Sequence, residues 1–480
     1  MTQPNTIVQR LPVVLLYQMM DGPYLYDANL DVFTPISFDT FQKLNVAFQS
    51  VHDGKVEIEK NSEIEKLIAK GFLSENRVEE LRHPLIETMR TFSQRALASI
   101  TLQVTQSCNL RCKYCIYSNQ IKKQRSHSQK KMEFETAIKG IDFLYERSMD
   151  APRINIGFYG GEPLLEFDMI KRLVEYAEEK FRGKEIGFSI TTNATLLTEE
   201  KYTYMQCHNF SITISIDGNR ESHNRNRVFL SGKGSFDQIA RNIKAIKEIH
   251  PDVPATLTIS TVIDPEIPLT LESSTASEFL KGIRVNAAVV ELEDPNQISF
   301  SEDFSEKYQY FRFLSLRKFY GKLSASCELP TFCSEGIEKL YHEFKSLGSC
   351  SRLPQIGAPD GPCMPGLLRL FINADGDFFP CEKVSELSEV MNIGSIYKGF
   401  DFGKMENIIN FSTISHRNCK TCPVFRHCGI CAKLCDGGDK LSEDAFLSAC
   451  SNSIDDFKGR LKYWTLFYKE LKLDTRYSKV

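Results

Sequence analysis

The chain has 480 residues with 59 Lys or Arg and 62 Asp or Glu, so its formal net charge is -3. This length suits about three ordinary domains, and a near-neutral chain without a long basic run disfavours nucleic acid as an obligatory partner. The longest apolar runs, such as 11–16, are far too short to span a membrane, and the amino terminus lacks a signal-peptide pattern. We therefore expect a cytoplasmic protein with no membrane partner.

The 15 cysteines need an explanation other than disulfides, because a reducing compartment does not maintain a disulfide framework. They are unevenly distributed: four lie before residue 320, and the others lie between Cys327 and Cys450. This distribution indicates two metal-bearing regions.

Residues 1–95 contain no cysteine and predict a small sheet with packed helices, a winged-helix-like arrangement. We expect a strand at Leu11–Tyr17, two short strands within Pro23–Phe33, and helices at Phe38–Val51, Ser62–Lys70 and Asn76–Phe92. Such a domain either caps its neighbour or binds a peptide as an added strand at an exposed sheet edge.

Residues 96–315 alternate between β-branched runs and helical periodicity, which predicts an α/β fold with a parallel sheet curled into a partial (β/α)6 barrel. The expected strands are Ile100–Thr105, Ile154–Tyr159, Ile186–Thr191, Ser211–Ile216, Ala255–Ile263 and Val285–Val290. The expected helices are Glu133–Arg147, Phe167–Arg182, Thr198–Met205, Ser235–His250 and Leu271–Lys281. In such folds the active site lies at the carboxyl ends of the strands.

The most informative motif follows the first of these strands, where Cys108, Cys112 and Cys115 form a C-x3-C-x2-C run. Three thiolates at this spacing can hold three irons of a cubane cluster and leave the fourth iron open to a small molecule. Structural zinc and unligated thiols are the alternatives.

A second motif, Gly160-Gly161-Glu162-Pro163, follows the second expected strand and so belongs to the same rim. Its glycines remove side chains where a ligand approaches the backbone, and Glu162 offers a carboxylate to a ligand ammonium. Taken alone, the motif is also an ordinary turn.

Together the two motifs, with Tyr114 before the last cysteine, resemble the radical S-adenosylmethionine (SAM) superfamily. The resemblance implies a [4Fe-4S] cluster on the three catalytic cysteines, with SAM on the open iron as the source of a 5'-deoxyadenosyl radical. It implies Tyr114 near the adenine, Glu162 on the methionine amino group and Arg227 on the methionine carboxylate. The full set of SAM-contacting residues that it implies is Tyr114, Gly160, Gly161, Glu162, Pro163, Thr191, Asn193, Ser215, Asp217 and Arg227. A strand-end cap or a surface charge is the alternative for Tyr114, Glu162 and each of the last five.

Residues 316–480 contain a hairpin at Leu370–Cys381 with an Asn-Ala-Asp-Gly turn and a dense cysteine series, and they resemble the SPASM domain of peptide-modifying radical enzymes. The resemblance implies two auxiliary [4Fe-4S] clusters, three clusters in all, where a zinc ribbon is the alternative. Their candidate ligands are Cys350, Cys363, Cys381, Cys419, Cys422, Cys428, Cys431, Cys435 and Cys450.

The expected ligand sets are Cys350, Cys363, Cys381 and one late cysteine for the inner cluster, and Cys419, Cys422, Cys428 and Cys450 for the outer one. These sets are what the resemblance implies, and with nine cysteines for eight places one is surplus. The SPASM pattern usually reads C-x2-C-x5-C-x3-C, whereas Cys428 is followed here by Cys431 and Cys435 at spacings of x2 and x6. This departure leaves open whether Cys431 or Cys435 is the fourth ligand of the inner cluster, or whether one iron stays open for a substrate thiolate.

Three cysteines remain outside these sets. Cys207 follows a barrel helix and is expected to be a buried apolar residue. Cys327 and Cys333 lie between the domains, as substrate-handling thiols or alternative ligands.

The amino-terminal segment is also similar to the winged-helix elements that bind leader peptides in ribosomal peptide (RiPP) maturases. The combined resemblance implies a maturase that forms an intrapeptide thioether, with a precursor peptide and a flavodoxin- or ferredoxin-type electron donor as partners. A carbon–carbon crosslink or side-chain cyclisation is the runner-up. Sulfatase-maturase-like residue oxidation is less favoured, because Glu382 stands where such enzymes commonly have an aspartate. A non-enzymatic iron-sulfur regulator is the alternative of another class.

Overall fold

A computed structural model of the chain describes residues 6–118, 124–250, 257–270, 280, 282–289, 300–349, 351–367 and 369–471. The chain divides into two compact units, one made of residues 1–87, 339–363 and 406–480, the other of residues 88–338 and 364–405. The cysteine-rich segment therefore contributes to both units. The expected division at residues 95 and 315 remains a prediction.

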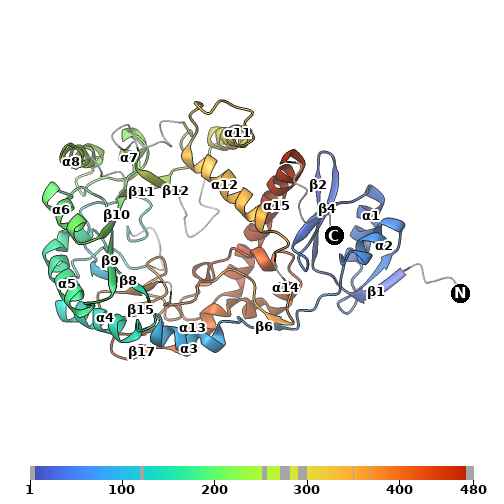
Figure 1. The fold of residues 1–480 in the computed structure, drawn as a ribbon, viewed down its shortest axis with the longest axis horizontal. Coiled ribbons are helices and arrows are strands. Elements are labelled where there is room, and N and C mark those ends of the chain that lie inside the picture. The colour runs from blue at the N-terminus through green and yellow to red at the C-terminus, as the bar shows by residue number, and fades with distance from the viewer. Residues whose placement is uncertain are drawn as a thin grey trace. The chain divides into compact units, whose positions relative to one another are not determined.

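The second unit contains an α/β fold built on an eight-stranded sheet with the order β12-β11-β10-β9-β8-β7-β14-β15 (Figure 1). Its six neighbouring strands from β7 to β12 are all parallel, as predicted for a partial barrel. These strands are β7 (Ser99–Thr105), β8 (Arg153–Gly160), β9 (Glu185–Thr192), β10 (Phe210–Ser215), β11 (Leu257–Ile263) and β12 (Arg284–Val289).

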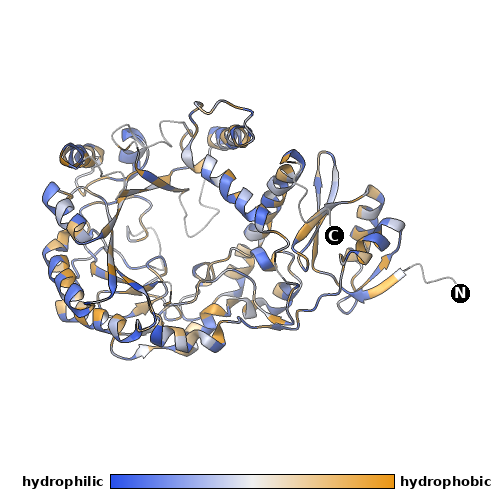
Figure 2. Ribbon diagram, in the orientation of Figure 1, coloured by the Kyte–Doolittle hydropathy of each residue, from blue (hydrophilic) through white to orange (hydrophobic). Residues whose placement is uncertain are grey.

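A row of helices lies along one side of the parallel strands (Figure 1) and carries both hydrophobic and hydrophilic residues (Figure 2). These are α4 (Phe134–Arg147), α5 (Phe167–Lys180), α6 (Glu199–Cys207) and α8 (Phe236–Ile249), close to the predicted bounds. Their apolar faces are buried: Ile141, Leu173 and Ile243 are each 0% exposed, which follows from the 3.6-residue period of the sequence. The predicted helix at Leu271–Lys281 lies almost entirely outside the described residues.

The predicted hairpin at Leu370–Cys381 is present as β14 (Leu370–Ile372) and β15 (Phe378–Phe379). It also extends the barrel sheet, because β14 pairs in parallel with β7, with Leu370 opposite Ile100. This pairing assigns Cys381, two residues after β15, to the same unit as the three-cysteine loop. Three elements contain a boundary between the two units: α3 (Ile86–Arg95), α12 (Thr331–Ser346) and α13 (Phe402–Ile409). The remaining elements of the second unit are η1 (Pro163–Glu166), α7 (Arg220–Asn226), α11 (Glu302–Phe319), β16 (Gly394–Ser395) and β17 (Gly399–Phe400).

The first unit begins with a three-stranded antiparallel sheet, β2-β3-β4, and a two-stranded pair, β1-β5. The strands are β1 (Thr6–Arg10), β2 (Val14–Met19), β3 (Gly22–Asp27), β4 (Val32–Pro35) and β5 (Lys55–Glu59), and the helices are α1 (Phe38–Gln49) and α2 (Ser62–Ala69). The last 75 residues of the chain add η4 (Phe411–Ser415), α14 (His416–Lys420), η5 (Phe425–His427), η6 (Ala432–Cys435) and α15 (Glu443–Leu471).

The predicted helix at Asn76–Phe92 is wrong over its first half. Pro84 disfavours helix at the residue before it, and the helix α3 starts only at Ile86. Upstream, the Asn76 side chain accepts a hydrogen bond from the Val78 amide, and the short strand β6 (Glu80–Leu81) pairs with β13 (Ile356–Gly357). A partner 276 residues away along the chain therefore fixes this segment as extended, where local periodicity indicated helix.

The long helix α15 packs against the amino-terminal sheet within the first unit. Tyr26 of β3 meets Phe457 of α15 edge to face at 5.0 Å, and the Tyr17 and Thr465 hydroxyls are 2.9 Å apart. The sheet and the end of the chain thus share one core.

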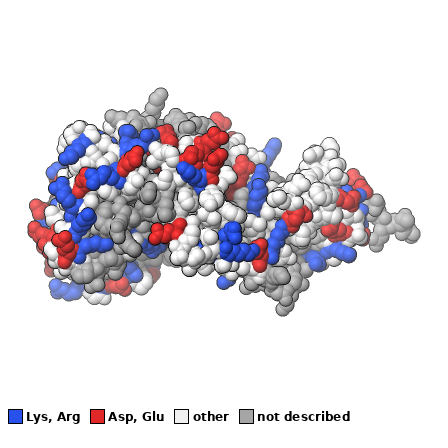
Figure 3. Space-filling view, turned by 90° about the horizontal axis from the view of Figure 1, so that it is seen from above, with Lys and Arg blue, Asp and Glu red and all other residues white. Residues whose placement is uncertain are grey.

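Within the described part of the chain, no helix combines the length and apolar character needed to cross a membrane. Basic and acidic side chains are interspersed on the face shown in Figure 3.

Candidate iron-sulfur and cofactor site

The three cysteines of the first motif lie in the loop that leaves the carboxyl end of β7. Burial raises the pKa of Cys108 to about 12 and that of Cys112 to about 11, and the neighbouring thiols of the motif add to both shifts. Burial also raises the pKa of Cys115. Without metal these thiols stay protonated at neutral pH, and a metal that binds them displaces the protons.

Nitrogen atoms lie close to two of the sulfurs in this loop. The Leu110 amide donates to Cys108 Sγ at 3.4 Å, and Asn193 Nδ2 lies 3.9 Å from the same sulfur. His127 Nε2 lies 3.8 Å from Cys115 Sγ. Hydrogen bonds to sulfur are among the features that tune the potential of an iron-sulfur cluster.

Gly160 and Gly161 make room for the cysteine loop itself. A Cβ at Gly160 would lie 2.0 Å from the Thr105 carbonyl oxygen, and one at Gly161 would lie 2.1 Å from that of Ser107. Gly160 also has a φ of +144°, which side chains rarely adopt. The backbone of residues 105–108 thus approaches both glycines; their predicted contact with a ligand is untested.

Glu162 is fully buried and bonds to the chain. Its carboxylate accepts hydrogen bonds from the Leu164 amide, the Thr192 hydroxyl and the Asn193 amide, at 2.7–3.0 Å. Burial raises its pKa, and these bonds act in the opposite direction. Glu162 thus joins the end of β8 to the end of β9, with Pro163 starting η1; a contact with a ligand ammonium remains a prediction.

Asn193 connects the end of β9 to the cysteine loop. Besides its contact with Cys108, its Nδ2 donates to Asn109 Oδ1 at 2.9 Å, and its Oδ1 accepts from the amide and hydroxyl of Thr195. Thr191 and Ser215 are half-buried near the ends of β9 and β10. The structure therefore gathers at one rim the strand-end residues that the sequence predicted.

Tyr114, Asp217 and Arg227 form one buried group at this rim. Arg227 Nε and Nη2 donate to the two carboxylate oxygens of Asp217 at 2.8 and 3.1 Å, and the Tyr114 hydroxyl donates to Asp217 as well. The guanidinium carbon of Arg227 lies 5.3 Å from the centre of the Tyr114 ring. The partner that the structure gives Arg227 is Asp217; its predicted role on a methionine carboxylate is untested.

The cysteines of the outer set lie together in the first unit. Burial raises the pKa of Cys419, and the thiols of Cys422, Cys450, Cys428 and Cys435 raise it further. Burial raises the pKa of Cys422 and of Cys450 to about 11, again with contributions from Cys428. Five thiols thus lie within electrostatic range of one another.

The described residues do not bring together the predicted ligands of the inner cluster. Cys350 lies outside the described residues, Cys381 belongs to the second unit, and Cys363 is exposed in the first. Of the two candidates for the fourth ligand, Cys435 is buried and Cys431 is exposed. The ligands of the inner cluster stay a prediction.

Both cysteine groups suit iron by their chemistry. Among the described residues, no three His, Cys, Asp or Glu side chains converge as a single metal ion requires. A cubane cluster distributes its thiolate ligands over separate iron corners, and thiolate is its ordinary ligand. The thiol donors of both groups thus fit a cluster by their chemistry, and which metal each group holds remains a prediction.

The three remaining cysteines differ in environment. Cys207 is exposed as the last residue of α6, so the prediction of a buried residue is wrong; Tyr202 and Met205 supply the buried face of that helix. Cys333 is buried in α12, which raises its pKa to about 12, and Cys327 is partly exposed. Their proposed roles are untested.

Residues that the sequence analysis missed fix the cysteine loop against the segment after Cys381. Arg125 and Glu386 form a nearly buried ion pair at 2.7 Å, and Gln103 Nε2 donates to the same Glu386 oxygen. The Arg125 guanidinium lies 3.8 Å above the ring of Tyr117, two residues after Cys115. No local sequence motif predicts this contact, because Arg125 and Glu386 are 261 residues apart in the chain.

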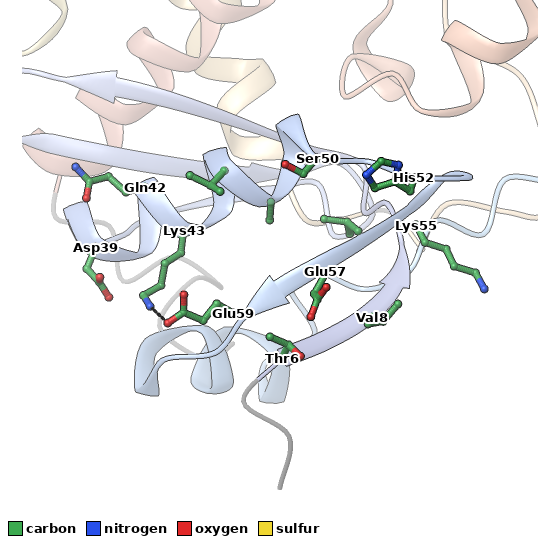
Figure 4. Close-up of a pocket in the computed structure, with 13 residues that line it drawn as sticks. Thr6, Val8, Asp39, Gln42, Lys43, Ser50, His52, Lys55, Glu57 and Glu59 are labelled. Carbon is green, nitrogen blue, oxygen red and sulfur yellow. Dashed lines mark hydrogen bonds and ion pairs between the residues drawn. The ribbon is translucent and has the colours of Figure 1, made fainter.

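A groove of about 990 Å³ lies in the amino-terminal part of the first unit, and residues of α1, β1 and β5 line it (Figure 4). Its apolar lining includes Val8 and Val46, which are both 65% exposed. Lys43 of α1 pairs with Glu59 of β5 across it. The groove thus combines exposed apolar side chains with charges of both signs at its rim.

Residues 102–270 match the Radical SAM superfamily. Over 204 residues the chain is 30% identical to the radical SAM cyclopropyl synthase TigE of Paramaledivibacter caminithermalis. This alignment covers 39% of the chain and 42% of TigE. It is 22% identical over 383 residues to a cysteine-type anaerobic sulfatase-maturating enzyme of Clostridium perfringens, covering 78% of this chain and 95% of that enzyme.

The structure of native anSMEcpe with bound AdoMet has the same fold, with a TM-score of 0.54 at 18% identity over 77% of this chain and all of that one. Against TigE and several other curated relatives, the chain spans less than half of the relative's length. The match and the cysteine loop together identify a radical SAM domain in this chain.

Proposed function

We propose that the protein is a radical SAM maturase that modifies a ribosomally made peptide, most simply by forming a thioether from a cysteine sulfur to a carbon of another residue. The main support for the proposal is that the cysteine loop lies against the Gly160–Glu162 turn. Asn193 and Asp217 contact the same loop and turn at this rim. This arrangement can hold three thiolates at one end of a parallel sheet, where such folds bind their ligands.

In this proposal the chain positions and shields reactive cofactors. Cys108, Cys112 and Cys115 would hold a [4Fe-4S] cluster, and cluster and SAM, when bound, supply a radical that abstracts hydrogen. The overall reaction turns SAM, a C–H group and a thiol into methionine, 5'-deoxyadenosine, a thioether and a proton, and the electron supplied at the start is recovered at the end. The buried ion pair of Asp217 and Arg227 would hold the rim beside the cysteine loop in one arrangement.

Precursor recognition is assigned to the amino-terminal part of the first unit. The groove beside β1 offers an exposed strand and apolar side chains, which suits a peptide that adds a strand and anchors alternate residues. A leader held there raises the local concentration of the core peptide at the sheet. Among proteins of this fold, anSMEcpe binds AdoMet together with the Cp18Cys peptide, which supports a polypeptide substrate.

Mass spectrometry of a precursor peptide after incubation with the reconstituted protein, SAM and a reductant tests the proposal. A thioether consumes a cysteine thiol, so the product is lighter by two hydrogens and no longer reacts with iodoacetamide. A product that keeps its thiols and has lost two hydrogens indicates the carbon–carbon crosslink. No change in the peptide, while SAM is cleaved, rules out this substrate.

Residue oxidation in the manner of a sulfatase maturase is the second candidate. The alignment with the Clostridium perfringens enzyme, which covers 95% of that enzyme, favours it. Glu382 follows Cys381 and accepts a hydrogen bond from Arg369 at 2.9 Å. Oxidation of a cysteine or serine to a carbonyl gives a hydrazide-reactive product, which a thioether does not.

A further inference from the structure

The turn between β3 and β4 is bound to the segment that immediately precedes Cys428. Asp31 lies in this turn, and His427 Nε2 lies 2.7 Å from its Oδ1, which also accepts the Tyr26 hydroxyl at 2.8 Å. The side chains of Asp31 and His427 are only 5% and 17% exposed. Both residues belong to the first unit.

Arg426 strengthens the same contact. Its Nε donates to the Ala28 carbonyl at 2.7 Å, and its Nη2 donates to the carbonyls of Asn29 and Ser351. The Asn29 side chain in turn accepts the Leu353 amide at 3.0 Å. One turn of the amino-terminal sheet thus holds two segments of the cysteine-rich region.

The His427 ring is fixed on its other faces by aromatic residues. It stacks on Phe457 at 5.2 Å with an interplanar angle of 20°, and it meets Trp464 at 5.3 Å and Tyr26 at 6.3 Å. Packing on three sides and the hydrogen bond at Nε2 restrict the orientation of the ring. The backbone of the next residue, Cys428, inherits that constraint.

We propose that Asp31 and His427 are positioning residues for the outer auxiliary cluster, which they serve by fixing the direction of the Cys428 thiol. The inference rests on the proposed outer ligand set of Cys419, Cys422, Cys428 and Cys450. Partners behind the ligands orient metal sites in general, and their loss lowers metal affinity. The three-stranded sheet β2-β3-β4, whose β3-β4 turn carries Asp31, is then part of the cluster's scaffold.

Charge gives the pair a second effect. Burial of Asp31 opposes its ionisation, but its hydrogen bonds with His427 and with the Tyr26 hydroxyl keep its pKa below the ordinary value. A carboxylate beside the ligand loop disfavours the extra electron of a reduced cluster. Removing this charge is expected to raise the cluster's midpoint potential.

The test compares Asp31→Gly and Asp31→Asn with the wild type in the full-length, reconstituted protein. Asp31 has a φ of +56°, so glycine removes the carboxylate without backbone strain, and asparagine tolerates the conformation while keeping an acceptor oxygen. The control is Asp21→Gly, because Asp21 also accepts a hydrogen bond from a tyrosine of β3 and pairs with Lys469 of α15, yet no predicted ligand is next to its partner.

Iron content and electron paramagnetic resonance of each variant are the readouts. Asp31→Gly is expected to lose about four irons per chain and the signal of one cluster. Asp31→Asn is expected to keep the cluster, with a raised midpoint potential. Asp21→Gly is expected to match the wild type. Unchanged iron, spectrum and potential in both Asp31 variants would overturn the inference. Equal iron in the wild type and in Cys428→Ala would instead show that no cluster uses Cys428, which overturns the proposed ligand set itself. Should Asp31→Gly not fold, the potential of Asp31→Asn alone decides.

Discussion

Arg227 and Asp217 form a two-point ion pair in which the side chains are 8% and 4% exposed, directly beside Tyr114 of the cysteine loop. The pair joins the end of β10 to the residue that follows α7. A buried ion pair is sensitive to the loss of one partner, because the other charge is left without compensation. The rim of the sheet therefore depends on this contact.

Replacing Arg227 with alanine is expected to destabilise the protein by about 3–5 kcal/mol, since Asp217 stays buried and unpaired. Urea unfolding of the purified variant measures this change. Arg225→Ala, two residues earlier in α7, is the control, because Arg225 is 44% exposed and pairs with Asp264 and Glu266. Its loss is expected to cost less than about 1 kcal/mol. Equal losses of unfolding free energy in the two variants would contradict the stabilising role of the buried Arg227–Asp217 ion pair.

Gly161→Ala is expected to displace the cysteine loop, because the new Cβ would lie 2.1 Å from the Ser107 carbonyl oxygen and 2.9 Å from the Cys108 nitrogen. Reconstitution should then give about four fewer irons per chain, the content of one cluster. Gly187→Ala is the matched control in β9, where the nearest atom is 3.7 Å away. Full iron content in Gly161→Ala would show that the loop does not need this close approach.

The buried carboxyl group of Asp27, in β3, is expected to make the free energy of unfolding depend on pH. Burial raises its pKa from 3.8 to about 6, although its carboxylate accepts hydrogen bonds from the Leu73, Leu30 and Asn29 amides. A raised folded-state pKa means that the stability contribution is fully present below about pH 4 and is lost as the pH rises through 6, by up to about 3 kcal/mol. Urea unfolding of wild type and Asp27→Asn from pH 4 to 7 checks this, because the variant should lack that part of the slope. Identical slopes would contradict it.

The groove between α1 and β1 makes a prediction about precursor binding. Val46→Asp places a charge among its exposed apolar residues and is expected to weaken binding of a fluorescent precursor at least about tenfold, with a stability change within about 0.5 kcal/mol. Phe38→Asp is the control, since Phe38 is 57% exposed on the same helix but does not line the groove. Unchanged affinity in Val46→Asp would place leader binding elsewhere. Point variants are preferable to deleting residues 1–95, because that deletion also removes Tyr26 and Asp31 from the shared core.

The parallel sheet was predictable from the sequence because its signals are local. Each strand from β7 to β11 is a short β-branched run followed by a helical period, and the cysteine and Gly-Gly-Glu motifs follow strands directly. Their convergence at one rim then follows from the rule for parallel sheets. Contacts over long sequence separations were not predictable: Leu370 beside Ile100, Glu80 beside Ile356, and Asp31 beside His427.

The role of the glycines also needed the structure. A Gly-Gly pair indicates a close approach, but the sequence does not say which group approaches, and here it is the backbone of residues 105–108. Likewise, Cys207 is apolar enough for a core, but its position at the end of α6 places it at the surface.

The central claim is that Cys108, Cys112 and Cys115 hold a cluster that cleaves SAM. The most direct measurement is the anaerobic incubation of the reconstituted, dithionite-reduced protein with SAM, followed by chromatography of the products. We expect 5'-deoxyadenosine and methionine in equal amounts from the wild type, and neither above background from Cys112→Ala. Equal product from the wild type and Cys112→Ala, or none from a wild type that holds its full iron, would contradict it.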